Sequence, residues 1–456
     1  MKRLGVSRLA GRAIFPSLGI IVLCLAVCGL PVRVQPQGKP ARKPSAPGLQ
    51  SKQDPLAPLL RQATEAIDKS DFASALDPLQ KYIAERPDDA YAHFQLGFAY
   101  AGLKRSEESK SEFSKAIALD PKMAAAHLNL GLVLMDSDPA AAAESFGHAA
   151  DLQPKESRPR FLEGFCLERA GKLPEAIAEY QTALGLSPQD YEIQFALGRA
   201  LLRTKDAAGA ETQFRGAVAA RGDSAPARLG LATALFDQNK YEDAAGAFAD
   251  YLKLKPEDRA AHFNRAAALF DLNRYDDALA ELDLADAGAA PSPDSLKMRG
   301  EIYVHQQKWK EAGVALTEAV KASPQDLEAA TWLGHVDIEL QDYPAAIEIL
   351  DQVYHRNPQS ADALRDLARA FFRHEDYGAA LGAMDRLDKL ETPPPATWFI
   401  RAICYDKLLR KAEAIDAYQK FLDGDNGRND TQDFQARHRI LVLQKELAQS
   451  PGKKKR

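Results

Sequence analysis

The sequence predicts an all-α protein built as a solenoid of tandem helix–turn–helix units. A 34-residue period in proline and alanine, small residues at one fixed place in each period, and paired apolar stretches with helical spacing all point to this fold class. A clear copy is residues 327–360, in which the apolar stretches 328–340 and 343–356 are separated by a tight turn. Pro358 closes this unit, because proline cannot continue a helix.

Single residue types locate the repeat along the chain. Prolines close successive units 33 or 34 residues apart, and each gap of 68 residues contains one unit that lacks its proline. These prolines are Pro87, Pro121, Pro154, Pro188, Pro256, Pro324 and Pro358. Alanine in the second stretch recurs every 34 residues from Ala142 to Ala414. Independent series with one period indicate a true repeat.

Small and bulky residues occupy matching places in the two helices of each unit. The first helix carries Gly or Ala at one position in every unit, from Ala63 to Ala402, which allows the second helix to approach closely. The second helix places a bulky apolar residue between its small ones, such as Phe146 or Leu350. Burial of each such side chain is worth about 1.5–3 kcal/mol. We therefore expect closely packed helix pairs.

This pattern resembles the tetratricopeptide repeat (TPR), a 34-residue helix–turn–helix with small, aromatic and proline positions at matching places. The resemblance covers about four-fifths of the chain. It implies a right-handed α-solenoid within residues 55–428. Eleven units are predicted, at residues 56–89, 90–123, 124–156, 157–190, 191–224, 225–258, 259–292, 293–326, 327–360, 361–394 and 395–428. The third unit is one residue short.

The N-terminal region differs from the repeats. A basic start precedes residues 13–30, which are apolar and uncharged, so residues 1–30 read as a secretory signal peptide. The stretch is close to the length that spans a bilayer, so an uncleaved membrane anchor is the alternative. We expect cleavage and export to a periplasmic or extracellular space, with a membrane tether through residues 13–30 as the other possibility. A third possibility is lipidation of Cys28, which is disfavoured because Val27 stands where a small residue is required.

Charge is distributed unevenly. Residues 31–54 form a Pro-rich, basic linker that lacks the apolar residues needed for folding, so we expect it to be disordered. Residues 1–53 hold nine Lys and Arg and no acid, which leaves 50 of the 59 basic residues against all 64 acidic ones. The rest of the chain has a formal net charge of −14. An acidic body argues against nucleic-acid binding.

The C-terminal region is predicted to close the solenoid. Residues 429–448 show helical spacing and should form a capping helix over the last repeat, because an end repeat cannot leave its apolar face exposed. The apolar residues concerned are Phe434, Ile440, Leu441, Leu443 and Leu447. Residues 449–456 form a basic tail that we expect to be disordered.

No motif for catalysis, metal binding or a cofactor is present in the sequence. Histidines recur at the fourth position of three units (His93, His127 and His262), where the family has large packing residues. Cys166 and Cys404 occupy equivalent positions seven repeats apart and read as small core residues. We therefore predict a protein that is not an enzyme and needs no cofactor or metal.

The resemblance implies that first helices line a concave surface through the second, fifth, ninth, twelfth and thirteenth positions of each unit. In the N-terminal half these positions are apolar, which predicts a groove for a partner peptide. The residues are Phe94, Phe98, Leu128, Leu132, Phe161, Phe165 and Phe195. The alternative is that these side chains pack internally.

A basic stripe is the second candidate site. It comprises Arg365, Arg369 and Arg373 in the tenth unit, with Arg199 and Arg203 in the fifth. Stacked guanidinium groups could clamp carboxylates of a partner. The alternative is a ladder of ion pairs within the helix, with Asp362, Asp366 and neighbouring acidic residues as partners.

The sequence thus predicts a non-enzymatic protein–protein interaction scaffold in an exported or envelope compartment, with protein or peptide partners on its concave surface. The alternative is a structural protein that oligomerises or organises an envelope complex without a discrete peptide ligand. The sequence leaves the partner's identity and the oligomeric state open.

Overall fold

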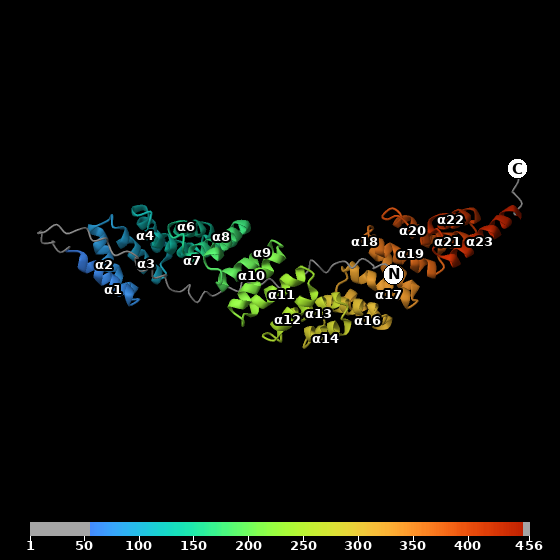
Figure 1. Ribbon diagram of the computed structural model, residues 1–456, viewed down its shortest axis with the longest axis horizontal. Helices are drawn as coiled ribbons and strands as arrows, with labels where there is room; N and C mark the ends of the chain where they lie inside the picture. Colours follow the sequence, from blue (N-terminus) through green and yellow to red (C-terminus); the bar gives the residue numbers. More distant parts are fainter. Residues whose placement is uncertain (1–54, 450–456) are drawn as a thin grey trace. The chain divides into compact units, whose positions relative to one another are not determined.

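The computed structural model describes residues 55–449. The predicted signal or anchor and the predicted linker lie outside these residues, as does the predicted basic tail apart from Gln449. Within the described part the chain forms 23 α-helices and no strand, which confirms the predicted fold class (Figure 1). None of the described helices is both long and apolar enough to span a bilayer.

The helices form eleven pairs followed by one further helix. Their bounds are α1 Ala57–Asp68, α2 Phe72–Glu85, α3 Ala90–Gly102, α4 Ser106–Leu119, α5 Ala124–Leu134, α6 Pro139–Leu152, α7 Ser157–Arg169, α8 Leu173–Leu186, α9 Tyr191–Arg203, α10 Ala207–Ala220, α11 Ala225–Asp237, α12 Tyr241–Leu252, α13 Arg259–Asp271, α14 Tyr275–Asp286, α15 Pro293–His305, α16 Trp309–Ala322, α17 Leu327–Glu339, α18 Tyr343–Arg356, α19 Ala361–Arg373, α20 Tyr377–Leu387, α21 Pro395–Lys407, α22 Lys411–Asp425 and α23 Asp430–Gln449. Each predicted unit therefore contains one pair.

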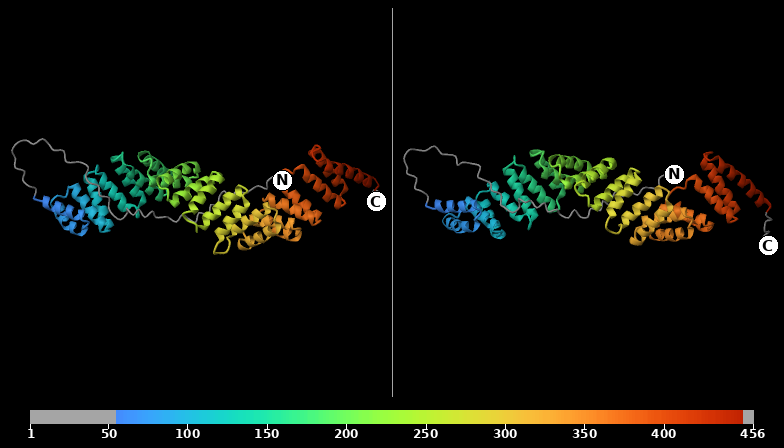
Figure 2. Two further views of the ribbon diagram at one scale, coloured as in Figure 1. Left: turned by 60° about the horizontal axis from the view of Figure 1, so that its bottom comes forward. Right: turned by 90° about the horizontal axis from the view of Figure 1, so that it is seen from below.

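The chain divides into two compact bodies, an N-terminal unit with α1–α12 and a C-terminal unit with α13–α23, separated between Glu257 and Asp258. Within each of them, consecutive pairs pack against each other in chain order (Figure 2). Within each unit, each later first helix also lies close to the second helix of the preceding pair, as α11 does to α10 and α19 to α18.

Helix starts follow from capping residues in the sequence. Nine helices begin after an aspartate whose carboxylate accepts a hydrogen bond from a backbone N–H of the first turn, as Asp71 does from Ser74 at 3.2 Å. Serines cap α11, α15 and α19 in the same way. These caps recur at the period of the repeat and mark where the capped helices begin.

The turn inside most pairs contains one residue with a left-handed backbone, two residues before the second helix. The non-glycine examples have φ between 58° and 64°: Ser70, Lys104, Lys205, Asn239, Asn273, Gln307, Gln341, Glu375 and Leu409. In the fourth pair Gly171 takes this place, with φ of 79°. The third pair does not use this turn: α5 has 11 residues, two fewer than most first helices, and its connection to α6 has four residues in place of three.

Small and bulky residues meet inside each pair as predicted. In the third pair, a Cβ added to Gly131 on α5 would lie 2.7 Å from the ring of Phe146 on α6, closer than real Cβ contacts allow. Phe146 is fully buried. The absence of a side chain at Gly131 is therefore what lets the ring of Phe146 lie against the first helix.

The helix α23 packs against α22 and forms part of the last core cluster through Ala436, Ile440 and Leu443. Of the five apolar residues of this segment, Ile440 and Leu443 are buried, whereas Phe434, Leu441 and Leu447 are exposed by 73, 58 and 42%. One face of a helix can contact a single underlying helix, so residues on its other face point to solvent.

Candidate functional site

The seven residues of the predicted groove lie on α3, α5, α7 and α9, and three of them are buried. Phe94 and Phe98 are each 7% exposed and Leu128 is 4% exposed. The ring centroids of Phe94 and Phe113 are 5.8 Å apart, and those of Phe98 and Phe72 are 6.2 Å apart. These three residues therefore fill space between helices and belong to the core, as the internal-packing alternative predicts, and they do not line an exposed surface.

The other four residues, Leu132, Phe161, Phe165 and Phe195, are half-buried and are called the apolar stripe below. They lie at the edge of two neighbouring core clusters, and Phe161 and Phe165 contact both clusters. The helices α7 and α9 that carry three of them lie against each other. Part of each of these four side chains therefore packs on the core, and part remains accessible.

Two arginines of the fifth pair meet one glutamate of the fourth pair beside the stripe. Arg199 donates to Glu168 at 3.0 Å and Arg203 donates to the same carboxylate at 2.7 Å. The hydroxyl of Tyr180 also donates to Glu168, at 3.0 Å. The carboxylate is 8% exposed, whereas the side chain of Arg203 is 51% exposed. Two guanidinium groups share one buried carboxylate, so an accessible positive charge remains next to the apolar stripe.

A half-buried glutamate on α7, between Phe161 and Phe165 in the sequence, has a raised pKa. Burial raises the pKa of Glu163 to about 7, and the nearby carboxylate of Glu179 adds to the rise, while Arg160 opposes it. Arg160 bridges Glu163 at 3.0 Å and Asp151 at 2.6 Å. This cluster joins α6, α7 and α8, so its role is to hold consecutive repeats together.

The three arginines of the tenth pair do not form the predicted ladder within α19 alone. Arg365 pairs with Asp362 at 2.5 Å in its own helix and with Glu391 at 2.9 Å beyond α20. Arg369 instead reaches the preceding repeat, where it pairs with Glu339 at 2.5 Å.

The other two charged residues, Asp366 and Arg373, also make no ion pair within α19. Asp366, predicted as a ladder partner, lies 3.1 Å from the ring Nδ1 of His335 on α17. Arg373 is exposed. The guanidinium groups of Arg365 and Arg369 therefore already have carboxylate partners from neighbouring segments, which a ligand would have to displace.

Sequence reasoning missed a charged cluster on the inner positions of the eighth pair. Lys297 on α15 is nearly buried and lies 3.1 Å from both Asp326 and Glu328. One turn further along α15, burial raises the pKa of Glu301 to about 8, and the carboxylate of Glu328 adds to the rise while Lys297 opposes it. Lys297 and Glu301 occupy the fifth and ninth positions of their unit, so the same transfer of inner positions that gave the apolar stripe could have found them.

The three histidines and the two cysteines singled out in the sequence are buried inside the repeats. His93 and His262 are buried, and each ring Nδ1 lies within 2.7 Å of a glutamate of its own pair, Glu112 and Glu281. Cys166 and Cys404 are buried free thiols, and burial raises the pKa of each to about 12. Within residues 55–449, no three His, Cys, Asp or Glu side chains gather in a way that could hold a metal ion.

The paired helices and their periodic small–bulky contacts define a tandem-repeat protein of the α-solenoid class. Profiles described as tetratricopeptide repeat match residues 134–191, 167–226, 229–295 and 333–394, and further profiles of that description match residues 90–123, 303–353 and 396–423. Together they cover more than half of the chain. The protein belongs to the tetratricopeptide repeat family, whose fold gives it the general role of a protein–protein interaction scaffold.

Solved structures with a similar arrangement include several repeat proteins. YrrB, described as a TPR protein with an unusual peptide-binding site, is 20% identical with a TM-score of 0.37, over 40% of this chain and 95% of that one. The Cut9–Hcn1 assembly of the APC/C is 13% identical with a TM-score of 0.39, over 86% of this chain and 96% of that one. Yeast Tom70 is 14% identical with a TM-score of 0.34, over 87% of this chain and 97% of that one. No curated protein sequence matches the chain significantly.

Proposed function

We propose that the protein is a non-enzymatic scaffold that captures a partner protein by binding one of its segments along the apolar stripe. The observation that carries this proposal is the run of half-buried Leu132, Phe161, Phe165 and Phe195 on successive first helices. An accessible strip of aromatic side chains held on a rigid core is the kind of surface that recognises peptides, because aromatic groups bury a large area with little loss of conformational freedom.

The charges beside the stripe indicate what the bound segment should contain. Arg203 shares Glu168 with Arg199 and keeps about half of its side chain exposed. A carboxylate of the partner, next to the partner's own apolar residues, would accept a charge-assisted hydrogen bond from Arg203 and balance the second guanidinium charge. The proposed ligand is therefore an apolar segment flanked by an acidic residue, in an extended or helical conformation.

The test is affinity capture with the full-length protein and with the double variant Phe161→Ser/Phe165→Ser. The scaffold should lose its captured partner by tenfold or more while keeping its helical content. A matched control is Leu119→Ser/Leu186→Ser, which removes two apolar side chains that are each 40% exposed on second helices of the same unit. Capture that survives in the stripe variant, or that is lost equally in the control, would overturn the proposal.

Thermal unfolding separates binding from folding in the same experiment. Phe161 lies 5.8 Å from Tyr180 between ring centroids, so its loss should lower the unfolding midpoint. The conservative variant Phe161→Leu/Phe165→Leu should restore the midpoint more fully than it restores capture, because a packed leucine replaces volume without the flat aromatic surface.

We also propose that the protein acts in an exported or envelope compartment. This rests on the basic start and the apolar residues 13–30 of the sequence. Fractionation combined with the mass of the purified chain tests it: a chain shortened at its N-terminus in the exported fraction supports cleavage, and a full-length chain in the membrane fraction supports the anchor. Full-length chain confined to the cytoplasm would contradict both.

A second candidate function, assembly through self-association, is favoured by the outer face of α23. Phe434 and Leu441 are two turns apart on this helix and are exposed by 73 and 58%, which is unusual for large apolar residues. If α23 joins copies of the chain, light scattering should show an oligomer that Phe434→Ser/Leu441→Ser converts to a monomer. A monomer before any substitution would rule this function out.

A further inference from the structure

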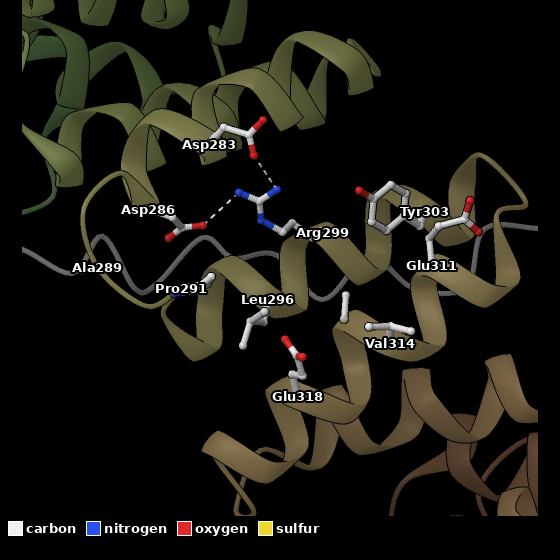
Figure 3. Close-up of a pocket in the computed structure, with 11 residues that line it drawn as sticks. Asp283, Asp286, Ala289, Pro291, Leu296, Arg299, Tyr303, Glu311, Val314 and Glu318 are labelled. Atoms are coloured by element: carbon white, nitrogen blue, oxygen red, sulfur yellow. Dashed lines mark hydrogen bonds and ion pairs between the residues drawn. The ribbon is translucent and has the colours of Figure 1, made fainter.

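An open cleft of about 610 Å³ lies between α14, α15 and α16 in the C-terminal unit (Figure 3). It is bordered by the seventh pair on one side and the eighth pair on the other. Its residues on α15 are Leu296, Arg299 and Tyr303, which are the fourth, seventh and eleventh positions of their unit. These positions lie on the opposite side of α15 from the inner residues Lys297 and Glu301, so the cleft is a different surface from the one proposed above to bind a peptide.

The cleft exists because a polar bridge replaces an apolar contact between two repeats. Arg299 occupies the seventh position of its unit, where the ninth and tenth units carry the core residues Leu333 and Leu367. The guanidinium of Arg299 instead spans Asp283 at 2.8 Å and Asp286 at 2.9 Å on α14. Figure 3 shows the side chain of Arg299 pointing to both carboxylates.

The loop after α14 keeps the same junction open. The helix α14 ends at Asp286 and has 12 residues, two fewer than α16 or α18. Gly288 follows with φ of 76°, and Pro291 lines the cleft. A shorter second helix leaves part of α15 and α16 without a covering neighbour.

The floor of the cleft is apolar and its rim is acidic. Val314 on α16 is 63% exposed, and Leu296 and Ala315 lie beside it. Glu311 and Glu318 stand on the same face of α16, on either side of Val314, and neither makes a hydrogen bond or ion pair within residues 55–449. With Asp283 and Asp286 the cleft carries four carboxylates against the single cation of Arg299.

We propose that this cleft is a second docking site, which takes a basic segment of a partner protein with a small aliphatic residue between two Lys or Arg residues. The aliphatic side chain covers Val314, and the two cations pair with Glu311 and Glu318. Seven residues of helix separate these glutamates by roughly 10.5 Å along the axis. An extended peptide advances about 3.3 Å per residue and every second side chain points to the same face, so the two basic residues are four positions apart with the aliphatic residue midway, a span that long Lys or Arg side chains adjust to the two glutamates.

The sign of the charge distinguishes this partner from the one proposed for the apolar stripe. Four carboxylates facing one guanidinium repel an acidic segment and attract a basic one, and this complementarity acts on both encounter and specificity. The scaffold can therefore hold two segments of opposite charge at separate places.

The test is selection of peptides from a displayed random library on the full-length protein, followed by fluorescence anisotropy with the best selected basic peptide. Selection is run with wild-type protein and with Glu311→Gln/Glu318→Gln, whose exposed side chains can change without loss of folding. We expect peptides enriched in Lys or Arg at positions i and i+4 with an aliphatic residue at position i+2. The Gln variant should bind the selected peptide at least tenfold more weakly.

The matched control is Asp243→Asn/Asp250→Asn, which makes the same change of two charges at the same two repeat positions on α12. This control should bind the peptide as wild type does, and so should Phe161→Ser/Phe165→Ser, because the two sites are separate. The proposal fails if no basic motif is enriched, if the Gln variant binds equally well, or if the α12 control weakens binding as much. A loss only in the Phe variant would place the basic peptide on the apolar stripe instead.

Discussion

Gly334 on α17 lies directly against Leu350 on α18: a Cβ added to Gly334 would come within 2.5 Å of the Cγ atom of Leu350. Leu350 is fully buried. The same contact recurs in other pairs, between Gly300 and Leu316 for example, where the distance would be 2.4 Å. The close approach of the two helices in a pair therefore depends on the missing side chain.

Substituting Gly334 by valine should destabilise the protein. The extra atoms would meet the branched end of Leu350 inside the packed pair, and overpacking of this kind costs about 1–3 kcal/mol. Urea unfolding followed by circular dichroism measures the change. Gly246→Ala on α12 is the control: nothing lies within 4 Å of its added Cβ, so this variant should gain about 0.5–1 kcal/mol. Equal effects of both substitutions would show that the close contact is not what selects glycine.

This pairing was predictable from the sequence because it depends on residue type at a fixed period. The series of Gly or Ala against a bulky residue gives the number of units, their bounds and the partner of each helix. The division of seven inner residues into buried Phe94, Phe98 and Leu128 and an accessible stripe was not predictable. The period assigns a residue to a face, whereas its exposure depends on how the next helix lies over it.

Ion pairs between repeats were also hidden from the sequence. Arg369 and Asp366 are neighbours on α19, yet the first pairs with Glu339 and the second with His335. Intervals of three or four residues predict contacts within one helix only. Contacts across repeats depend on the separation and rotation of adjacent helices, which no local pattern encodes.

Leu409 should be a site where a substitution stabilises the protein. It has φ of 59° and is 79% exposed, so leucine suffers the steric cost of a left-handed backbone without the benefit of burial. Leu409→Asn should raise the free energy of unfolding by up to about 1 kcal/mol, because asparagine adopts this conformation more readily. Thermal unfolding measures it, with Leu408→Asn as the control, since Leu408 has φ of −82° and should give no gain.

Arg401 should tolerate leucine better than alanine. Its side chain is 3% exposed and bridges Asp385 at 2.5 Å and Asp388 at 2.6 Å, at the repeat position where Leu333 and Leu367 stand in other units. Asp385 and Asp388 are 63 and 28% exposed, so water can hydrate both carboxylates once the guanidinium is removed; leucine fills much of its volume, while truncation to alanine leaves a larger cavity.

Chemical denaturation of the two Arg401 variants provides the measurement. We expect Arg401→Leu to lie within about 1 kcal/mol of wild type and Arg401→Ala to lose about 2 kcal/mol or more. If the leucine variant were as unstable as the alanine variant, the ion pairs would be the dominant stabilising contacts at this junction.

Glu301 should make the stability of the C-terminal unit depend on pH. Its pKa is about 8 in the folded protein, against an ordinary value of 4.5. Between these two values the folded state holds a proton that the unfolded state releases, so the free energy of unfolding falls as the pH rises from about 4.5 to about 8. Glu301→Gln removes this dependence.

The difference in thermal midpoint between Glu301→Gln and wild type, measured from pH 5 to pH 9, isolates the contribution of this one carboxyl group. The midpoint of the Gln variant should rise relative to that of wild type as the pH rises, and the difference should level off above about pH 8. Glu311→Gln, the same substitution at an exposed position of the same repeat, is measured beside it as the control. A constant difference for Glu301→Gln would refute the raised pKa.

Hydrogen exchange of the full-length protein, with and without its captured partner, tests the central claim most directly. The account predicts that the partner slows exchange in α7 and α9, around Phe161, Phe165 and Phe195, while the outer helices α8 and α10 change little. Slower exchange confined to the second helices or to α23, with α7 and α9 unaffected, would contradict the claim that the first helices form the binding surface.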